Sequence, residues 1–141
     1  MNDIVFLGIH QLKDLNLVKS WMRNIVEREG KTIGSLTYKF VDDKEMIQIN
    51  RKFLDHDNFT DIITFDYTEN NNISADIFIS TERVKENAQD LQLPFEEEMM
   101  RVIIHGVLHC LGYPDKTSEE KQQMRKKENE SLELFHVEHK I

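Results

Sequence analysis

The sequence is most constrained between His105 and Asp115, where it reads HGVLHCLGYPD. His105 and His109 are four residues apart, so a helix places both imidazoles on one face, where they can reach the same ion. Gly112 follows, and glycine lets a helix end in the left-handed conformation so that the chain turns back. The turn can return the Asp115 carboxylate to the two histidines. The spacing HxxxHxxGxxD therefore predicts three metal ligands and a fourth position for water, the arrangement of a catalytic zinc site.

The surroundings of the two histidines favour a metal site over an ordinary pair of polar residues. A lone HxxxH on a helix is more often such an ordinary pair. Here, however, apolar neighbours predict a buried helix, and an unpaired histidine pair in a core would be costly. These neighbours are Val102, Ile103, Ile104, Val107, Leu108 and Leu111. We therefore expect the histidines to bind a metal ion.

Gly106 argues against one class of metal enzyme. Helical zinc proteases place a glutamate directly after the first histidine as general base. Gly106 stands at that position and has no side chain that could accept a proton. A metal-bound hydroxide can still attack another electrophile, such as a phosphodiester. The motif therefore predicts hydrolysis, but not of peptides.

Two further segments accompany the histidine motif. Residues 60–65 read TDIITF, and residues 75–80 read ADIFIS. Together with the segment that begins at His105, they resemble in order and spacing the motifs TDVLSF, GDIxIS and HGxLHxxGYxH. These are motifs of the bacterial YbeY proteins, zinc-dependent endoribonucleases of ribosomal RNA maturation.

The resemblance implies a single hydrolase domain over residues 1–141, with one zinc ion bound by His105, His109 and Asp115. It implies cleavage of single-stranded RNA in the maturation of the 3′ end of small-subunit ribosomal RNA, and a part in ribosome quality control. The implied partners are ribosomal RNA and ribosomal proteins or assembly factors, with neither DNA nor a membrane. A cytoplasmic location is expected.

The sequence departs from the family pattern at two positions. Leu54 stands where the family usually has an arginine, so a phosphate contact made there would fall to a neighbour such as Arg51 or Lys52. Asp115 replaces the family's third histidine. Because carboxylate is a harder ligand than imidazole and adds negative charge, a divalent metal other than zinc also becomes a candidate.

The net charge of −8 argues against a broad nucleic-acid-binding surface. Phosphate binding draws on clustered lysine and arginine side chains, so RNA contacts would have to come from local basic groups. Three such groups are present: Arg51 with Lys52, Arg83 with Lys85, and the run from Lys121 to Lys127.

Candidate catalytic groups are few. Asp61 and Asp76 belong to the two motif strands and could orient a water molecule or a ligand, although either could equally cap a strand. His56 precedes the first of these strands and could touch a substrate. Cys110, the only cysteine, lies in the apolar helix and is expected in the core rather than as a nucleophile. No residue identifies itself as the general base.

Hydrophobic periodicity predicts nine elements in the order β-α-β-α-β-β-α-α-α. Strands are expected over residues 4–7, 35–41, 61–66 and 74–80. The first helix is expected from Leu12 to Gly30. The second is expected to follow Asp42 or Asp43, with Met46, Ile49 and Phe53 on one stripe. Three more are expected over residues 81–92, from Pro94 through the two histidines, and over residues 118–135. This order predicts an α+β domain, in which a four-stranded mixed sheet packs with about five helices and the metal helix lies in a cleft.

Two other functions stay open. Two histidines and one carboxylate with open positions are also the ligand set of non-haem iron(II) oxygenases, but those ligands usually come from separate strands. The other is a ribosome-assembly factor without catalytic activity, in which the metal mainly holds the end of the helix in place. Leu54 at the arginine position and the acidic composition favour this second alternative over the oxygenase.

Overall fold

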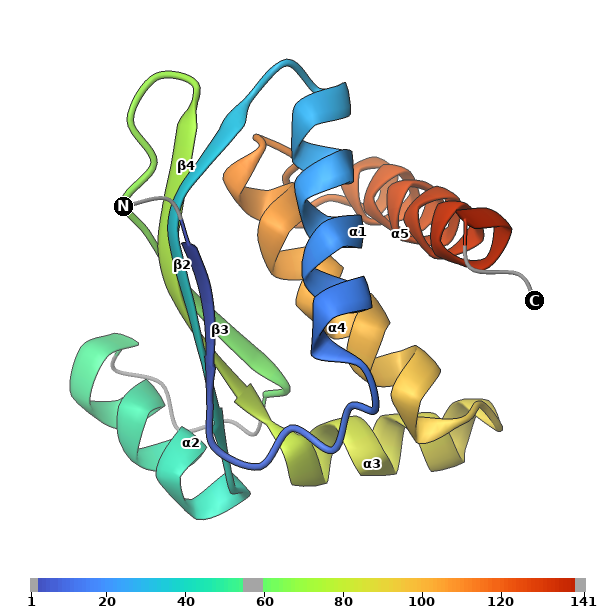
Figure 1. Ribbon diagram of the computed structural model, residues 1–141. Helices are drawn as coiled ribbons and strands as arrows, with labels where there is room; N and C mark the ends of the chain where they lie inside the picture. Colours follow the sequence, from blue (N-terminus) through green and yellow to red (C-terminus); the bar gives the residue numbers. More distant parts are fainter. Residues whose placement is uncertain (1–2, 55–59, 139–141) are drawn as a thin grey trace.

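The computed structural model describes residues 3–54 and 60–138, which form four strands and five α-helices (Figure 1). The strands are β1 (Asp3–Leu7), β2 (Thr32–Val41), β3 (Ile62–Asp66) and β4 (Asn72–Ser80). The helices are α1 (Leu15–Arg28), α2 (Asp43–Ile49), α3 (Thr81–Leu91), α4 (Phe95–Cys110) and α5 (Ser118–Glu138), with a short π-helix, η1 (Asn50–Leu54), after α2. The element order matches the order predicted from the sequence.

The strands form one mixed sheet in the order β1-β2-β4-β3. β1 and β4 run parallel to β2 on either side of it, and β3 pairs antiparallel with β4 at the edge. Figure 1 shows α1, α4 and α5 on one side of the sheet and α2 on the other. The predicted α+β fold, with a four-stranded mixed sheet and about five helices, is therefore confirmed.

The main hydrophobic core lies between the sheet and helices α1, α4 and α5. Leu36, Tyr38 and Phe40 alternate toward it from β2, as their spacing predicts, and Trp21 and Ile103 belong to the same core. The Tyr38 hydroxyl donates a 2.8 Å hydrogen bond to the Ile103 carbonyl oxygen, which ties β2 to α4 inside the core. A smaller cluster joins α2 to the opposite face of the sheet.

Side-chain caps fix where three of the helices begin. The carboxylates of Asp14 and Asp42 and the hydroxyl of Ser80 each accept a hydrogen bond from the backbone N–H three residues on, at 3.2, 2.8 and 3.2 Å. Asp42, rather than Asp43, is therefore the cap of α2. Because Asp14 caps α1, that helix begins three residues after the predicted start at Leu12.

Phe53 is far more exposed than the two residues with which it was predicted to share a stripe. Met46 is buried and Ile49 is half-buried, but the Phe53 side chain is 58% exposed. Residues 50–54 form a π-helix, whose wider turn breaks the 3.6-residue periodicity on which that stripe depends. The Phe53 ring packs edge-on against Phe65 of β3 instead, with the ring centroids 5.6 Å apart.

Helix α4 carries the histidine motif and is followed by the predicted glycine turn. Gly112 has a φ of +104°, a conformation that residues with a side chain rarely adopt. The N–H of Gly112 donates to the carbonyl of His109 and the N–H of Tyr113 to the carbonyl of Leu108, both at 3.0 Å. These two bonds reverse the chain toward Asp115.

Gly106 lies where α4 crosses the sheet at close range. A Cβ atom at this position would lie 2.9 Å from Cδ1 of Ile77 and 3.3 Å from Cδ1 of Ile62. Ile62 lines a cavity and can yield, but Ile77 is fully buried in a close-packed interior and can move only by disturbing its own neighbours. The absence of a side chain at Gly106 therefore sets the distance between the histidine helix and the sheet.

We expect Gly106→Ala to lower the free energy of unfolding by about 1–3 kcal/mol, the usual cost of overpacking a core, even though alanine is the better helix former. Denaturant unfolding measures the change. Gln123→Ala, at an exposed position of α5, is the control and should shift stability by less than about 0.5 kcal/mol. A Gly106→Ala protein as stable as the wild type would show that α4 can move away from the sheet without cost.

Candidate active site

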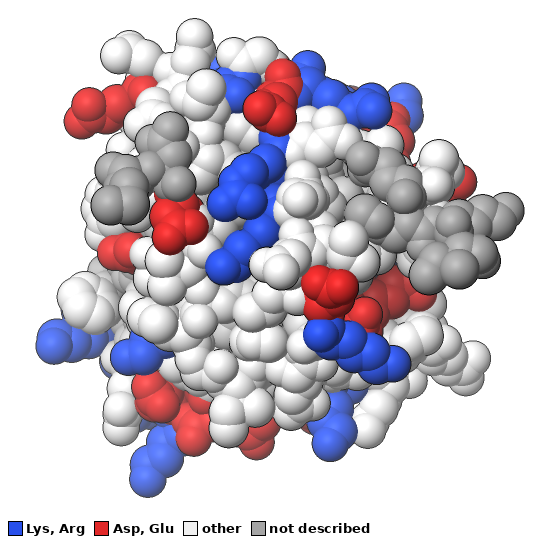
Figure 2. All heavy atoms as spheres, in the orientation of Figure 1, with Lys and Arg blue, Asp and Glu red and all other residues white. Residues whose placement is uncertain are grey.

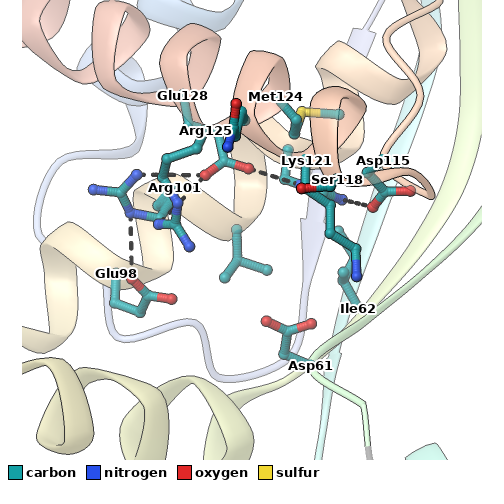
Figure 3. A pocket seen from close by; sticks show the side chains of 13 residues that line it. Asp61, Ile62, Glu98, Arg101, Asp115, Ser118, Lys121, Met124, Arg125 and Glu128 are labelled. Carbon is teal, nitrogen blue, oxygen red and sulfur yellow. Dashed lines mark hydrogen bonds and ion pairs between the residues drawn. The ribbon is translucent and has the colours of Figure 1, made fainter.

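A cavity of about 760 Å³ opens between α4, α5 and the start of β3 (Figure 3). Its wall combines apolar side chains, such as Ile62, Val102 and Met124, with ionisable ones. The ionisable residues are Asp61, Glu98, Arg101, His105, Asp115, Lys121, Arg125 and Glu128. A concave, partly apolar wall with convergent charged groups is typical of a ligand-binding or active site.

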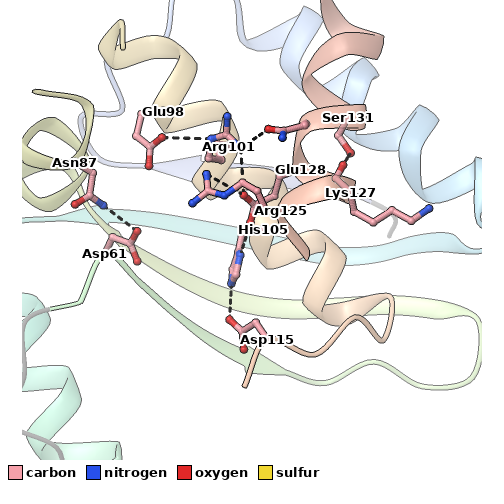
Figure 4. Close-up of polar contacts among 11 residues, drawn as sticks. Asp61, Asn87, Glu98, Arg101, His105, Asp115, Arg125, Lys127, Glu128 and Ser131 are labelled. Atoms are coloured by element: carbon pink, nitrogen blue, oxygen red, sulfur yellow. Dashed lines mark hydrogen bonds and ion pairs between the residues drawn. The ribbon is translucent and has the colours of Figure 1, made fainter. Parts of the chain in front are cut away.

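His105 connects two carboxylates in this cavity (Figure 4). Its Nδ1 lies 2.8 Å from Oε2 of Glu128, and its Nε2 lies 3.1 Å from Oδ2 of Asp115. An ionised carboxylate only accepts hydrogen bonds, so Nδ1 carries the proton in the contact with Glu128. Burial alone would lower the pKa of His105, but the hydrogen bond and charge of Glu128, together with Asp115 and Asp61, raise it above its usual value.

Glu128 is a buried carboxylate of α5 that has two arginines as further partners. Its Oε1 accepts a hydrogen bond from Nη1 of Arg101 at 3.3 Å and lies 3.7 Å from Nη1 of Arg125. Arg101 in turn donates to Asn129 at 2.8 Å and lies 3.4 Å from the buried Glu98 carboxylate. These contacts offset the cost of burying the carboxylates, and they join α4 to α5.

Of the two predicted catalytic aspartates, Asp61 lines the cavity and Asp76 does not. Oδ2 of Asp61 accepts a 3.2 Å hydrogen bond from the side chain of Asn87 on α3. Burial raises the pKa of Asp61, and the charge of His105 offsets this effect only in part. Asp76 is exposed on β4. The geometry therefore supports Asp61 as the candidate for proton transfer.

Two of the three predicted metal ligands are in contact. His105 and Asp115 meet in the cavity, whereas His109 is exposed one turn further along α4 and does not line the cavity. Across residues 3–54 and 60–138, no three His, Cys, Asp or Glu side chains gather as a complete metal-binding group. The chemistry of His105 nevertheless suits a metal, because metal-binding histidines commonly donate their other ring N–H to a carboxylate. The three-ligand site stays a prediction.

None of the four basic residues predicted first for RNA contact lines the cavity. Arg51 and Lys52 are exposed on η1, and Lys85 is exposed on α3. Arg83 is ion-paired with Asp43, with Nε 3.1 Å from Oδ2. The basic run on α5, by contrast, does reach the cavity.

Sequence reasoning missed Glu98, Arg101 and Glu128. In the sequence they are indistinguishable from solvated charges, because the contacts of Glu128 with His105 and Arg101 span 23 and 27 positions. One signal was available: Met124 and Glu128 are one helical turn apart, so a face of α5 that buries Met124 carries Glu128 inward with it.

Two predictions concern single residues elsewhere. Cys110 is buried in the core, as predicted, and burial raises the pKa of its thiol to about 12, which leaves it in the unreactive thiol form. His56, predicted as a possible substrate contact, lies outside the described residues.

Known proteins are similar in sequence to this chain. A family model described as Endoribonuclease YbeY matches residues 8–136. The chain belongs to the YbeY endoribonuclease family. Among its YbeY relatives, the Endoribonuclease YbeY of Flavobacterium psychrophilum is 49% identical over 118 residues, 84% of each chain. The Endoribonuclease YbeY of Cytophaga hutchinsonii is 47% identical over 126 residues, which cover 89% of this chain and 88% of the relative.

A solved structure is also similar to this YbeY chain. It is the solution structure of TM1509 from Thermotoga maritima, with a TM-score of 0.68 and 27% sequence identity. The similarity covers 96% of this chain and 91% of that chain. The YbeY resemblance seen in the three sequence motifs is therefore confirmed over nearly the whole chain.

We expect Arg101→Met to lower the free energy of unfolding by about 3–5 kcal/mol, because it leaves the buried carboxylates of Glu98 and Glu128 without their shared cation. Burial already raises the pKa of Glu98 while Arg101 opposes this, so the pKa should rise further in the variant. A raised pKa in the folded state means that the fold binds the proton more tightly. Acidification should therefore reduce the loss, as urea unfolding at neutral and mildly acidic pH can measure.

Arg125→Met is the matched control for this experiment. The Arg125 side chain is 56% exposed and lies 3.7 Å from Glu128, so its removal should cost less than about 1 kcal/mol. Equal losses in the two variants would contradict the assignment of Arg101 as the principal partner of the buried carboxylates.

Proposed function

We propose that this chain is a zinc-dependent endoribonuclease that cleaves single-stranded RNA in the maturation of the 3′ end of small-subunit ribosomal RNA and in ribosome quality control. The main supporting observation is the contact of His105 with Asp115 in the cavity, with the other ring nitrogen of His105 held by Glu128. Endoribonuclease is also the activity that the names of its relatives state.

In this proposal His105, His109 and Asp115 hold the metal. A zinc ion held there would supply Lewis-acid chemistry for the hydrolysis of a phosphodiester. Glu128 would keep the proton on Nδ1 of His105, so that Nε2, which faces Asp115, is the nitrogen that would give up its proton to bind the metal. Asp61 accepts or returns a proton in the cavity, since a pKa raised by burial brings its carboxylate closer to the working pH.

The size of the cavity supports a single-stranded substrate. A volume of about 760 Å³ is that of a small-molecule pocket, so the cavity can take in one or two nucleotides but not a duplex. On the face drawn in Figure 2, basic and acidic side chains are interspersed, and the basic ones gather only in small groups. Both observations favour local contacts over binding along an extended helix.

The acidic composition also favours the alternative of a ribosome-assembly factor without catalytic activity, whose metal mainly holds the end of α4. A net charge of −8 suits docking to basic ribosomal proteins. We propose ribosomal proteins and assembly factors as partners, whether the chain is an endoribonuclease or a non-catalytic factor. The iron oxygenase gains no support from the family to which the chain belongs.

Within the described ranges, no helix is long and apolar enough to cross a membrane.

Cleavage of a defined single-stranded ribosomal RNA fragment tests the proposal. The zinc-loaded wild type should cleave, a chelator should stop it, and His109→Ala should be slower by more than about 100-fold, because even partners of metal ligands affect activity 10- to 100-fold. The two proteins are purified in parallel, since contaminating ribonuclease would appear in both. Equal cleavage by both would contradict the proposal, and binding of ribosomal particles without cleavage under any divalent metal would favour the assembly factor.

We expect Glu128→Gln to weaken zinc binding by about 10- to 100-fold, because the neutral amide no longer holds and polarises the His105 ring. Competition with a chromogenic chelator measures the affinity, and circular dichroism checks the fold. Glu130→Gln, at an exposed position on the same helix, should bind zinc like the wild type. An unchanged affinity in folded Glu128→Gln would show that His105 is not a ligand oriented by this carboxylate.

A further inference from the structure

Two basic side chains of α5, Lys121 and Arg125, line the cavity. They are four residues apart, so they lie on one face of the helix and about 6 Å apart along its axis. Figure 3 shows them reaching from α5 over the cavity, Lys121 on the side of Asp115 and Arg125 on the side of Arg101. The α5 face of the cavity thus presents two positive charges in a row.

These two cations are accessible to a ligand, whereas the third cation of the cavity is not. The Arg101 side chain is only 13% exposed and is engaged by Glu98 and Glu128. Arg125 is 56% exposed, with Glu128 at the longer distance of 3.7 Å. Lys121 is exposed, and no residue of the described part of the chain forms an ion pair with it. Arg101 is therefore structural, while Lys121 and Arg125 can exchange water for an anion at little cost.

We propose that Lys121 and Arg125 bind two phosphate groups of the single-stranded RNA that enters the cavity. The inference rests on the proposed function and adds to it the residues that hold the strand. Lysine offers a compact charge and arginine a planar fork, both suited to phosphate oxygens. Because His105 and Asp115 belong to the same cavity, a strand fixed by α5 would present a neighbouring phosphodiester to them.

The charges along the cavity favour α5 as the site of the phosphates. Ser118, at the positive end of the α5 dipole, lines the cavity, but Glu119 and Glu120 in the first turn oppose that dipole, so the attraction for phosphate comes from the Lys121 and Arg125 side chains. The other basic groups of the sequence, Arg51 with Lys52 and Arg83 with Lys85, lie away from the cavity and cannot hold a strand against its wall.

The salt dependence of RNA binding tests the inference. The probe is a single-stranded oligonucleotide of about ten nucleotides with phosphorothioate linkages, which each keep one negative charge. Gel electrophoresis checks that it stays intact during the titration, and the protein is used as purified. In single strands each phosphate contact contributes about 0.7 to the slope of log Kobs against log salt concentration. The double variant Lys121→Gln/Arg125→Gln should reduce that slope by about 1.4 and weaken binding about ten-fold at low salt. Lys121→Arg/Arg125→Lys keeps both charges and should retain the slope.

The control Lys13→Gln/Lys44→Gln removes the same charge from exposed positions that neither line the cavity nor belong to a predicted RNA-contact group, and it should leave the slope unchanged. An unchanged slope in the cavity variant, an equal fall in the control, or no binding of the probe by the wild type would overturn the inference. Cleavage is scored separately. A wild type that cleaves RNA while the cavity variant keeps its slope refutes this inference alone. A wild type that binds through both cations and cleaves nothing refutes the proposed catalysis alone.

Discussion

The arrangement of the cavity depends on one buried carboxylate, that of Glu128. It contacts His105 and Arg101 of α4, and an unpaired charge at this depth would cost several kcal/mol. Helix α5 can therefore dock only where both partners reach the carboxylate, and this requirement fixes the width of the cavity. The same docking orients the His105 ring and brings Lys121 and Arg125 to the opposite wall. The Glu128 carboxylate thus contributes both to the stability of the fold and to the chemistry of the site.

The position of α4 against the sheet is the second constraint. Gly106 lets the helix lie close to β3 and β4, and the hydrogen bond from Tyr38 to the Ile103 carbonyl holds it there from within the core. The turn after α4 is tied to the residue that ends α1, because the Tyr113 hydroxyl donates to Oε1 of Glu29 at 2.8 Å. The helix and the turn that returns the chain to the cavity are therefore anchored independently, which limits how far Asp115 can separate from His105.

Local rules explain which parts of this molecule the sequence could predict. The helix, the glycine turn and the return of Asp115 to His105 all follow from backbone preferences within one short segment, and all three are confirmed. The role of Glu128 could not be predicted, because it requires the docking of a helix far along the chain. The roles of Asp61 and Asp76 could not be told apart either, since the sequence places both in neighbouring strands; in the structure Asp61 lies just before β3. Only the pairing of β3 with β4 puts Asp76 opposite Phe65, at an exposed position.

An acidic chain can still bind an RNA substrate, because the net charge of the chain and the local cations of the cavity act at different distances from the strand. At physiological ionic strength, interactions between exposed charges are screened beyond about 8 Å, so most of the net charge of −8 has little effect on a strand already in the cavity. Within that distance the strand meets the exposed cations Lys121 and Arg125, whereas the buried carboxylates of Glu98 and Glu128 are already paired with Arg101 and His105. The net charge instead acts on approach, where it provides no long-range attraction for free RNA. Substrate capture would then depend on docking to a basic surface that already holds the RNA, and the cations of α5 would set the register of the strand only after that encounter.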